Sequence, residues 1–250
     1  MPCVKCNVHI METVVIPVET TIRLGFLALL AATITPGAAS AQPCPTASYS
    51  DYLALASCTV GDKTYSVFSF VSDAGGSGIA PDPSSITVTP EMTADGPGLT
   101  FSSDAITVTQ DTASDVISSV DVDLDYTVTA GSGFLIDDAD LGVTGDISGN
   151  GQGGVTDFLT ASSSGMTLPT LSVQLPGTSD TTTFPPVDAV NVFKDISVDV
   201  LAGSTGSADV TIVSQTFSQT TAVPEPSTLA LLGAGMLGFG VARRRKQSTG

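Results

Sequence analysis

The chain has 250 residues, of which 25 are acidic and 8 are basic, and its net charge is −17 at pH 7. Residues 42–222 keep only Lys63 and Lys194 as basic residues and contain no arginine, histidine or tryptophan. Such an acidic surface repels phosphate backbones and excludes nucleic-acid binding, and without histidine the Ser-His-Asp and Cys-His arrangements are excluded from this stretch.

The N-terminal segment has the three regions of a secretory signal peptide. Arg23 precedes an apolar run over 24–32, and the small residues Ala39 and Ala41 follow at cleavage-site spacing. We therefore expect residues 1–41 to form an extension and a signal peptide, recognised by the Sec translocon and removed by signal peptidase after Ala41. Met11 is an alternative start to Met1.

Two cysteines, Cys44 and Cys58, lie just after the expected cleavage site. An exported chain meets an oxidising compartment, so this even count predicts one disulfide, with two separate buried thiols as the alternative. The loop between them contains 50–55, which is expected to be a short helix or turn.

The stretch 42–222 reads as β-structure throughout. Alternation is clearest over 121–129, where Val122, Leu124, Tyr126 and Val128 are expected in the core and the residues between them in water. Further strands are expected at 63–71, 85–89, 98–102, 105–110, 171–175, 192–201 and 207–217, separated by turns at 73–78, 80–83, 95–98, 145–154 and 201–206. Many short strands with turn signals predict an all-β fold, an antiparallel, jelly-roll-like β-sandwich, with two smaller sandwiches as the alternative.

One segment, 146–157, has the spacing of a calcium-binding loop, with oxygen-bearing side chains and Gly151 at its sixth position. The expected ligands are Asp146, Ser148, Asn150, Gln152 and Asp157. The alternative is a hairpin in which Asn150-Gly151 forms a type I′ turn. Ca²⁺ is the only cofactor that the sequence suggests.

The C-terminal segment 223–250 contains three parts in a fixed order. Val223, Pro224, Glu225 and Pro226 come first, an apolar run over 229–242 follows, and the last part is a basic stop of Arg243, Arg244, Arg245 and Lys246. The run is near the length of a thin or tilted membrane span, and the positive-inside rule keeps the basic stop in the cytoplasm. We therefore expect a single transmembrane helix here.

This three-part pattern resembles the PEP-CTERM sorting signal of Gram-negative bacteria that secrete exopolysaccharide. The resemblance implies recognition by an exosortase, a transient stay in the inner membrane, and delivery to the cell surface or the extracellular space. Residues 53–66 also resemble a set of PEP-CTERM-anchored proteins that open with a cysteine-containing segment. That set has no assigned activity.

Together these features predict an exported structural or adhesive protein of the cell surface or extracellular matrix, with exopolysaccharide as a partner. Its Ser/Thr-rich surface suits hydrogen bonding to glycans. A Ca²⁺-dependent carbohydrate-binding module is one alternative. A carboxylate-based glycoside hydrolase is the other, but no spacing singles out an acid pair, so no enzyme is expected.

Overall fold

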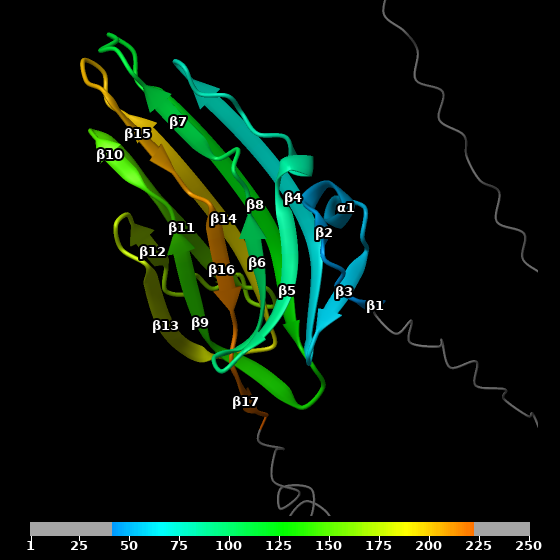
Figure 1. Cartoon of the computed structure of the whole chain (residues 1–250). Helices are drawn as coiled ribbons and strands as arrows, with labels where there is room; N and C mark the ends of the chain where they lie inside the picture. The colour runs from blue at the N-terminus through cyan, green and yellow to red at the C-terminus, as the bar shows by residue number, and fades with distance from the viewer. Residues whose placement is uncertain (1–41, 223–250) are drawn as a thin grey trace, which may run out of the picture. The chain divides into compact units, whose positions relative to one another are not determined.

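The structure, a computed structural model, describes residues 42–222, which form two layers of β-sheet (Figure 1). The first layer, sheet A, has the strand order β1-β3-β4-β8-β14-β11-β12. Its strands are β1 (Gln42–Pro43), β3 (Ser57–Val60), β4 (Lys63–Gly75), β8 (Ser118–Ala130), β14 (Ala189–Val200), β11 (Gly151–Ala161) and β12 (Leu171–Gln174). All neighbouring pairs are antiparallel except β1 and β3.

The second layer, sheet B, has the order β13-β9-β16-β6-β5-β2, with β17 also paired to β9. Its strands are β13 (Ser179–Val187), β9 (Phe134–Thr144), β16 (Ile212–Thr216), β6 (Gly96–Ser102), β5 (Thr87–Thr93), β2 (Ala47–Ser48) and β17 (Gln219–Thr221). A small third sheet joins β10 (Ile147–Gly149), β15 (Gly206–Asp209) and β7 (Thr107–Gln110). One helix, α1 (Tyr49–Leu53), and a 3₁₀ turn (Pro83–Ser85) complete the described elements.

A single apolar core lies between the two large sheets. The alternation expected over 121–129 is confirmed, because Val122, Leu124, Tyr126 and Val128 are buried while Asp121 is exposed. Valine, leucine and isoleucine dominate the inward positions of the central strands, as the pleat of a half-buried sheet favours. The prediction of an all-β sandwich built from antiparallel sheets is confirmed at this level.

Several strand predictions were incomplete. The expected strand 207–217 divides into β15 and β16, because at Val210 the chain leaves the third sheet for sheet B. Strands β9, β11 and β13 were not predicted. The expected turn at 145–154 instead contains β10 and the first residues of β11.

The two ends of the described region lie near the same end of the sandwich. Strand β1 pairs with Cys58 and Thr59, next to the β3–β4 turn, and β17 pairs with residues 134–136, next to the β8–β9 turn. These two turns adjoin, since a Cβ on Gly131 would lie 2.9 Å from the carbonyl oxygen of Asp62. Strands β7, β10 and β15 lie at the opposite end (Figure 1).

Candidate functional site

The outer face of sheet A carries the best-formed candidate binding surface. Strands β8, β14 and β11 lie side by side, with Asp125, Phe193 and Phe158 in register across them. Around this row is a hollow of about 340 Å³. We call it the aromatic hollow, and its lining includes Val67, Asp125, Thr127, Phe158, Thr160, Asn191 and Phe193.

Two phenylalanines give the aromatic hollow its apolar floor. Phe158 is 48% exposed and Phe193 is 38% exposed, and their ring centroids lie 5.9 Å apart at an interplanar angle of 49°. Both rings stand at outward positions of strands whose inward neighbours are buried. A pair of contacting aromatic rings left in water is a typical mark of a binding surface.

Polar groups surround these rings. The hydroxyl of Thr127 donates to Oδ1 of Asn191 at 2.9 Å, and the hydroxyl of Ser69 donates to Oδ2 of Asp125 at 2.6 Å. These bonds hold the amide and the carboxylate in place, while each keeps further capacity for hydrogen bonding. An apolar floor with a few fixed polar groups is the usual arrangement of a small-ligand or sugar site.

The rim of the hollow contains a strained residue. Val67 has φ of 57°, and it is the one non-glycine with positive φ among residues 42–222. It lies in a bulge of β4, where the pairing to β8 shifts between Ser66 and Ser69. The bulge reverses the alternation, so that Tyr65 points inward before it and Phe68 packs against the core after it, leaving Val67 71% exposed at the rim. A β-branched residue in this conformation is strained, and such strain concentrates at functional sites.

Beside the hollow, three carboxylates gather on the same face. The oxygens of Asp121, Asp123 and Asp195 all lie within 4.8 Å of one another, and Asp123 and Asp195 are direct cross-strand partners. The pKa of Asp123 is raised by burial and then by Asp121 and Asp125. That of Asp195 is raised by burial and then by Asp121 and Asp123. This three-carboxylate cluster has the charge and the oxygen ligands that a divalent cation prefers.

The outer face of sheet B has a second depression, which we call the acidic groove. It measures about 440 Å³, and its lining includes Glu91, Thr93, Asp95, Asp140, Asp180, Thr181 and Ser214, with no aromatic residue. Burial raises the pKa of Asp140, a hydrogen bond with Thr181 opposes this shift, and Asp138 and Asp95 add to it. The groove is therefore a polar, negatively charged site without an apolar floor.

The five residues expected to bind calcium do not come together. Asp157 lies six residues along β11 from Gly151, about 20 Å in an extended strand, and its buried carboxylate binds Nζ of Lys194. Ser148 instead bonds to Ser207, and Asp146, Asn150 and Gln152 are exposed. The calcium-loop prediction is therefore corrected, since the segment enters a strand before its last ligand. The alternative hairpin is not formed either, because β10 pairs with β15 and the positive φ falls on Gly149.

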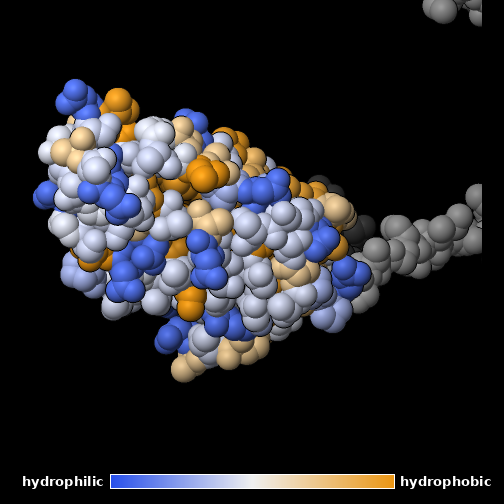
Figure 2. Space-filling view, turned by 45° about the horizontal axis from the view of Figure 1, so that its top comes forward, coloured by the Kyte–Doolittle hydropathy of each residue, from blue (hydrophilic) through white to orange (hydrophobic). Residues whose placement is uncertain are grey.

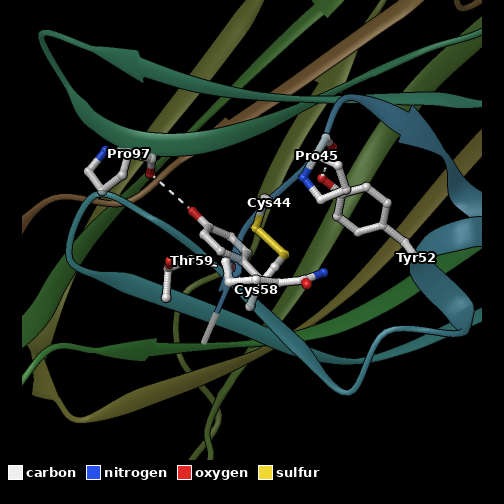
Figure 3. The surroundings of a disulfide bond; sticks show 8 residues. Cys44, Pro45, Tyr52, Cys58, Thr59 and Pro97 are labelled. Carbon is white, nitrogen blue, oxygen red and sulfur yellow. Dashed lines mark hydrogen bonds between the residues drawn. A yellow bond between two sulfur atoms is a disulfide. The ribbon is translucent and has the colours of Figure 1, made fainter. Parts of the chain in front are cut away.

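Cys44 and Cys58, the expected pair, are joined by a disulfide (Figure 3). The segment between them crosses from sheet A to sheet B and back, because β2 pairs with β5. Helix α1 begins with a capping box between Ser48 and Asp51, and it buries Tyr49 and Tyr52. The hydroxyl of Tyr52 donates to the carbonyl oxygen of Pro45 at 2.6 Å, and partial burial raises the pKa of Tyr52 to about 12.

The face shown in Figure 2 is chemically mixed. Most of its residues are of intermediate hydropathy, with small hydrophobic and hydrophilic groups between them. This agrees with the Ser/Thr-rich composition noted in the sequence.

Sequence reasoning did not single out Phe158, Phe193 or Asn191. A usable signal was present, because Phe193 falls out of phase with Val192 and Ile196, which are buried. The register that places Phe158 opposite Phe193 was not readable from the sequence. The predicted signal residues Ala39 and Ala41, the sorting residues 223–226 and the basic stop 243–246 lie outside the described residues.

Among residues 42–222, no helix is long and apolar enough to cross a bilayer. Residues 222–246 match the family model of the PEP-CTERM protein-sorting motif. The protein therefore contains a PEP-CTERM motif, which confirms the predicted resemblance. The motif implies processing by an exosortase and indicates an exported, surface-directed protein.

The other comparisons are weak. No curated protein matches the sequence. A solved structure of TmCBM61 in complex with β-1,4-galactotriose has 12% identity and a TM-score of 0.26, over 61% of this chain and 88% of that chain. The family 11 carbohydrate-binding module of a cellulosomal cellulase of Clostridium thermocellum has 8% identity and a TM-score of 0.21, over 63% and 90%. At these TM-scores the likenesses support no inference about this chain.

Proposed function

We propose that this protein is an exosortase-sorted adhesive protein of the cell surface or extracellular matrix, and that it binds polysaccharide at the aromatic hollow. The observation that carries the proposal is the exposed pair Phe158 and Phe193 inside a ring of fixed polar groups. The aromatic faces offer a surface for the C–H faces of a sugar ring, while Asn191 and Asp125 offer hydrogen bonds to its hydroxyls. The sorting motif supports the proposal, because it indicates a surface-directed protein and polysaccharide is the partner expected there.

The processing steps form part of the same proposal. The leader 1–41 directs export through the Sec translocon and is removed by signal peptidase, and the apolar run 229–242 holds the chain in the inner membrane. An exosortase then acts near residues 223–226 and releases the mature domain, 42–222, to the cell surface or the extracellular space. Intact-mass measurement of the exported protein tests this order. A mature species that still contains Arg243 to Lys246 would contradict it.

Binding is tested with a panel of neutral and acidic polysaccharides, measured by calorimetry on the purified protein. We expect affinity for at least one uncharged or weakly charged polymer, and a loss of about tenfold or more when Phe158 and Phe193 are both replaced by alanine. The matched control is Asp140→Asn in the acidic groove, which leaves binding unchanged. Binding that survives the double alanine variant would overturn the assignment of the site.

A Ca²⁺-dependent form of this binding is the second candidate, favoured by the three-carboxylate cluster beside the hollow. Calorimetry repeated with Ca²⁺ and with a chelator distinguishes Ca²⁺-dependent binding from metal-free binding. Binding that requires Ca²⁺ and is lost in Asp123→Asn supports the second candidate. Binding that is equal in both conditions supports the metal-free form.

A further inference from the structure

A lysine and an aspartate face each other in the dry core of the sandwich. Asp157 on β11 and Lys194 on β14 are direct cross-strand partners, and both side chains are 0% exposed. Nζ of Lys194 lies 2.6 Å from Oδ1 and 2.8 Å from Oδ2 of Asp157. Each of the two residues thus takes an inward position that an apolar side chain would ordinarily fill.

The surroundings of the pair exclude water. In the register of sheet A, Leu124 is the partner of Lys194 on one side and Leu171 is the partner of Asp157 on the other, and both leucines are fully buried. Across the core, Oε1 of Gln215 on β16 accepts a hydrogen bond from Nζ of Lys194 at 2.9 Å. Gln215 is itself fixed, because its Nε2 donates to the carbonyl oxygen of Asp140 at 3.0 Å.

A buried ion pair of this kind is costly to keep in the core. The loss of hydration from both charges is costly, and their attraction seldom exceeds that cost. Burial lowers the pKa of Lys194 and raises the pKa of Asp157, and in each case the partner's charge opposes the shift only in part. Both shifts are toward the neutral amine and the neutral acid, so burial lowers the cost of the proton transfer that makes the amine of Lys194 nucleophilic.

We propose that Lys194 and Asp157 become joined by an intramolecular amide bond in the folded protein. The bond forms between Nζ of Lys194 and Cγ of Asp157, and one Cγ–O bond of the carboxylate breaks. Of the three ammonium protons, one stays on the amide nitrogen and two leave with the departing oxygen as water. The reaction consumes one positive and one negative charge and needs no oxidant or other reagent.

Two physical effects favour this reaction in the core over the same reaction in water. Fixed contact between the reacting groups replaces a bimolecular encounter, and for well-oriented groups this corresponds to an effective concentration on the order of 10⁵ M or more. Amide formation also removes two buried charges that have already lost their hydration. In water the same reaction would remove two hydrated charges and would lose the free energy of their hydration. The water molecule that forms leaves for bulk solvent.

The bond is detected by the intact mass of the full chain after purification, denaturation and reduction of the disulfide. We expect a mass lower by one water molecule than the sequence requires, once the ends of the chain have been assigned. Digestion with trypsin gives an independent readout, because Lys63 and Lys194 are the sole basic residues in 42–222. An acylated Lys194 resists trypsin, so the peptide that begins at Thr64 should continue past it.

A double variant and the protease readout together separate this bond from other losses of water. A different aspartate that loses water by cyclisation would leave Lys194 cleavable by trypsin. The lower mass and the resistance of Lys194 to trypsin must therefore occur together. In Lys194→Met with Asp157→Leu both features should disappear, and apolar replacement of both partners of a buried pair commonly preserves the fold. A wild-type chain of unreduced mass that trypsin cuts after Lys194 would overturn the proposal.

Discussion

The outer faces of the two sheets are both acidic, yet they differ in what they can bind. The face of sheet A combines carboxylates with two exposed phenylalanines and a strained bulge at Val67. The acidic groove of sheet B has four carboxylates with serine and threonine, and no aromatic residue in its lining. Acidity is thus a property of the whole domain and does not mark a site, whereas exposed aromatic rings and local strain occur together on one face.

The largest expected effect comes from the disulfide, and it should act on both faces equally. The bond closes a loop of sequence separation 14, whose strand β2 joins sheet B while Cys58 lies in sheet A. Replacing both cysteines by serine should lower the free energy of unfolding by about 3 kcal/mol. Denaturant unfolding measures this loss.

Reduction of the wild-type disulfide serves as the control and should give a similar loss. Polysaccharide binding by the fraction that stays folded should not change, because Phe158 and Phe193 lie on β11 and β14, which do not pair with β3. A selective loss of binding in the folded serine variant would show that the disulfide segment shapes the sheet A face in particular.

A smaller change in the free energy of unfolding is expected from the bulge in β4, which borders the face of sheet A. Val67→Gly removes the side chain that is strained at positive φ and should stabilise the protein by about 1 kcal/mol. Val67→Ala is the matched control, because alanine keeps the Cβ atom and most of the strain. Midpoints of denaturant unfolding that place the alanine variant above the glycine variant would contradict this reading of Val67.

The smallest effect concerns the repelling carboxylates. Like charges directly opposite each other destabilise a sheet by roughly 0.2–1 kcal/mol, so Asp123→Asn should raise the melting temperature at pH 7 by about 1–4 °C. The raised pKa of Asp123 means that the folded protein binds this proton more tightly than the unfolded chain does. Stability from this group is therefore lost as the pH rises above the ordinary value of 3.8, and the gain from Asp123→Asn should vanish in acid.

Melting temperatures measured with added divalent cations compare the two faces. Added Ca²⁺ should raise the melting temperature of the wild type through the three-carboxylate cluster and have less effect on Asp123→Asn. Asp140→Asn, in the acidic groove, should keep the full response to Ca²⁺. An equal response in the two variants would mean that neither face concentrates cations more than the other.

The sequence predicted the central strands well where alternation was strict, as in Val122 to Val128. It failed where buried charges or exposed aromatic residues broke the pattern. Strand β11 was missed because its glycines resembled a turn, and because Asp157 occupies an inward position that composition alone assigns to water. Lys194 lies in phase with the buried Val192 and Ile196, which is a readable sign of a buried charge.

The partner of that charge could not be read in the same way. Asp157 meets Lys194, and Phe158 meets Phe193, through a single register between β11 and β14. Register depends on the whole sheet, since a slip of one residue turns every side chain to the other face. The candidate site and the buried pair are therefore the two sides of one strand pairing that local sequence does not specify.

Strands β1 and β17 place the two ends of the described region near the same end of the sandwich. Attachment of the domain at that end would direct its strands away from the support. Both outer faces are then open from the side to polymer strands that run along the cell surface. The far end contains the segments that follow β4, precede β8 and follow β14, with exposed Ile79, Val116, Ile117 and Leu201. This end then faces outward, so that a single domain presents three chemically different surfaces in three directions.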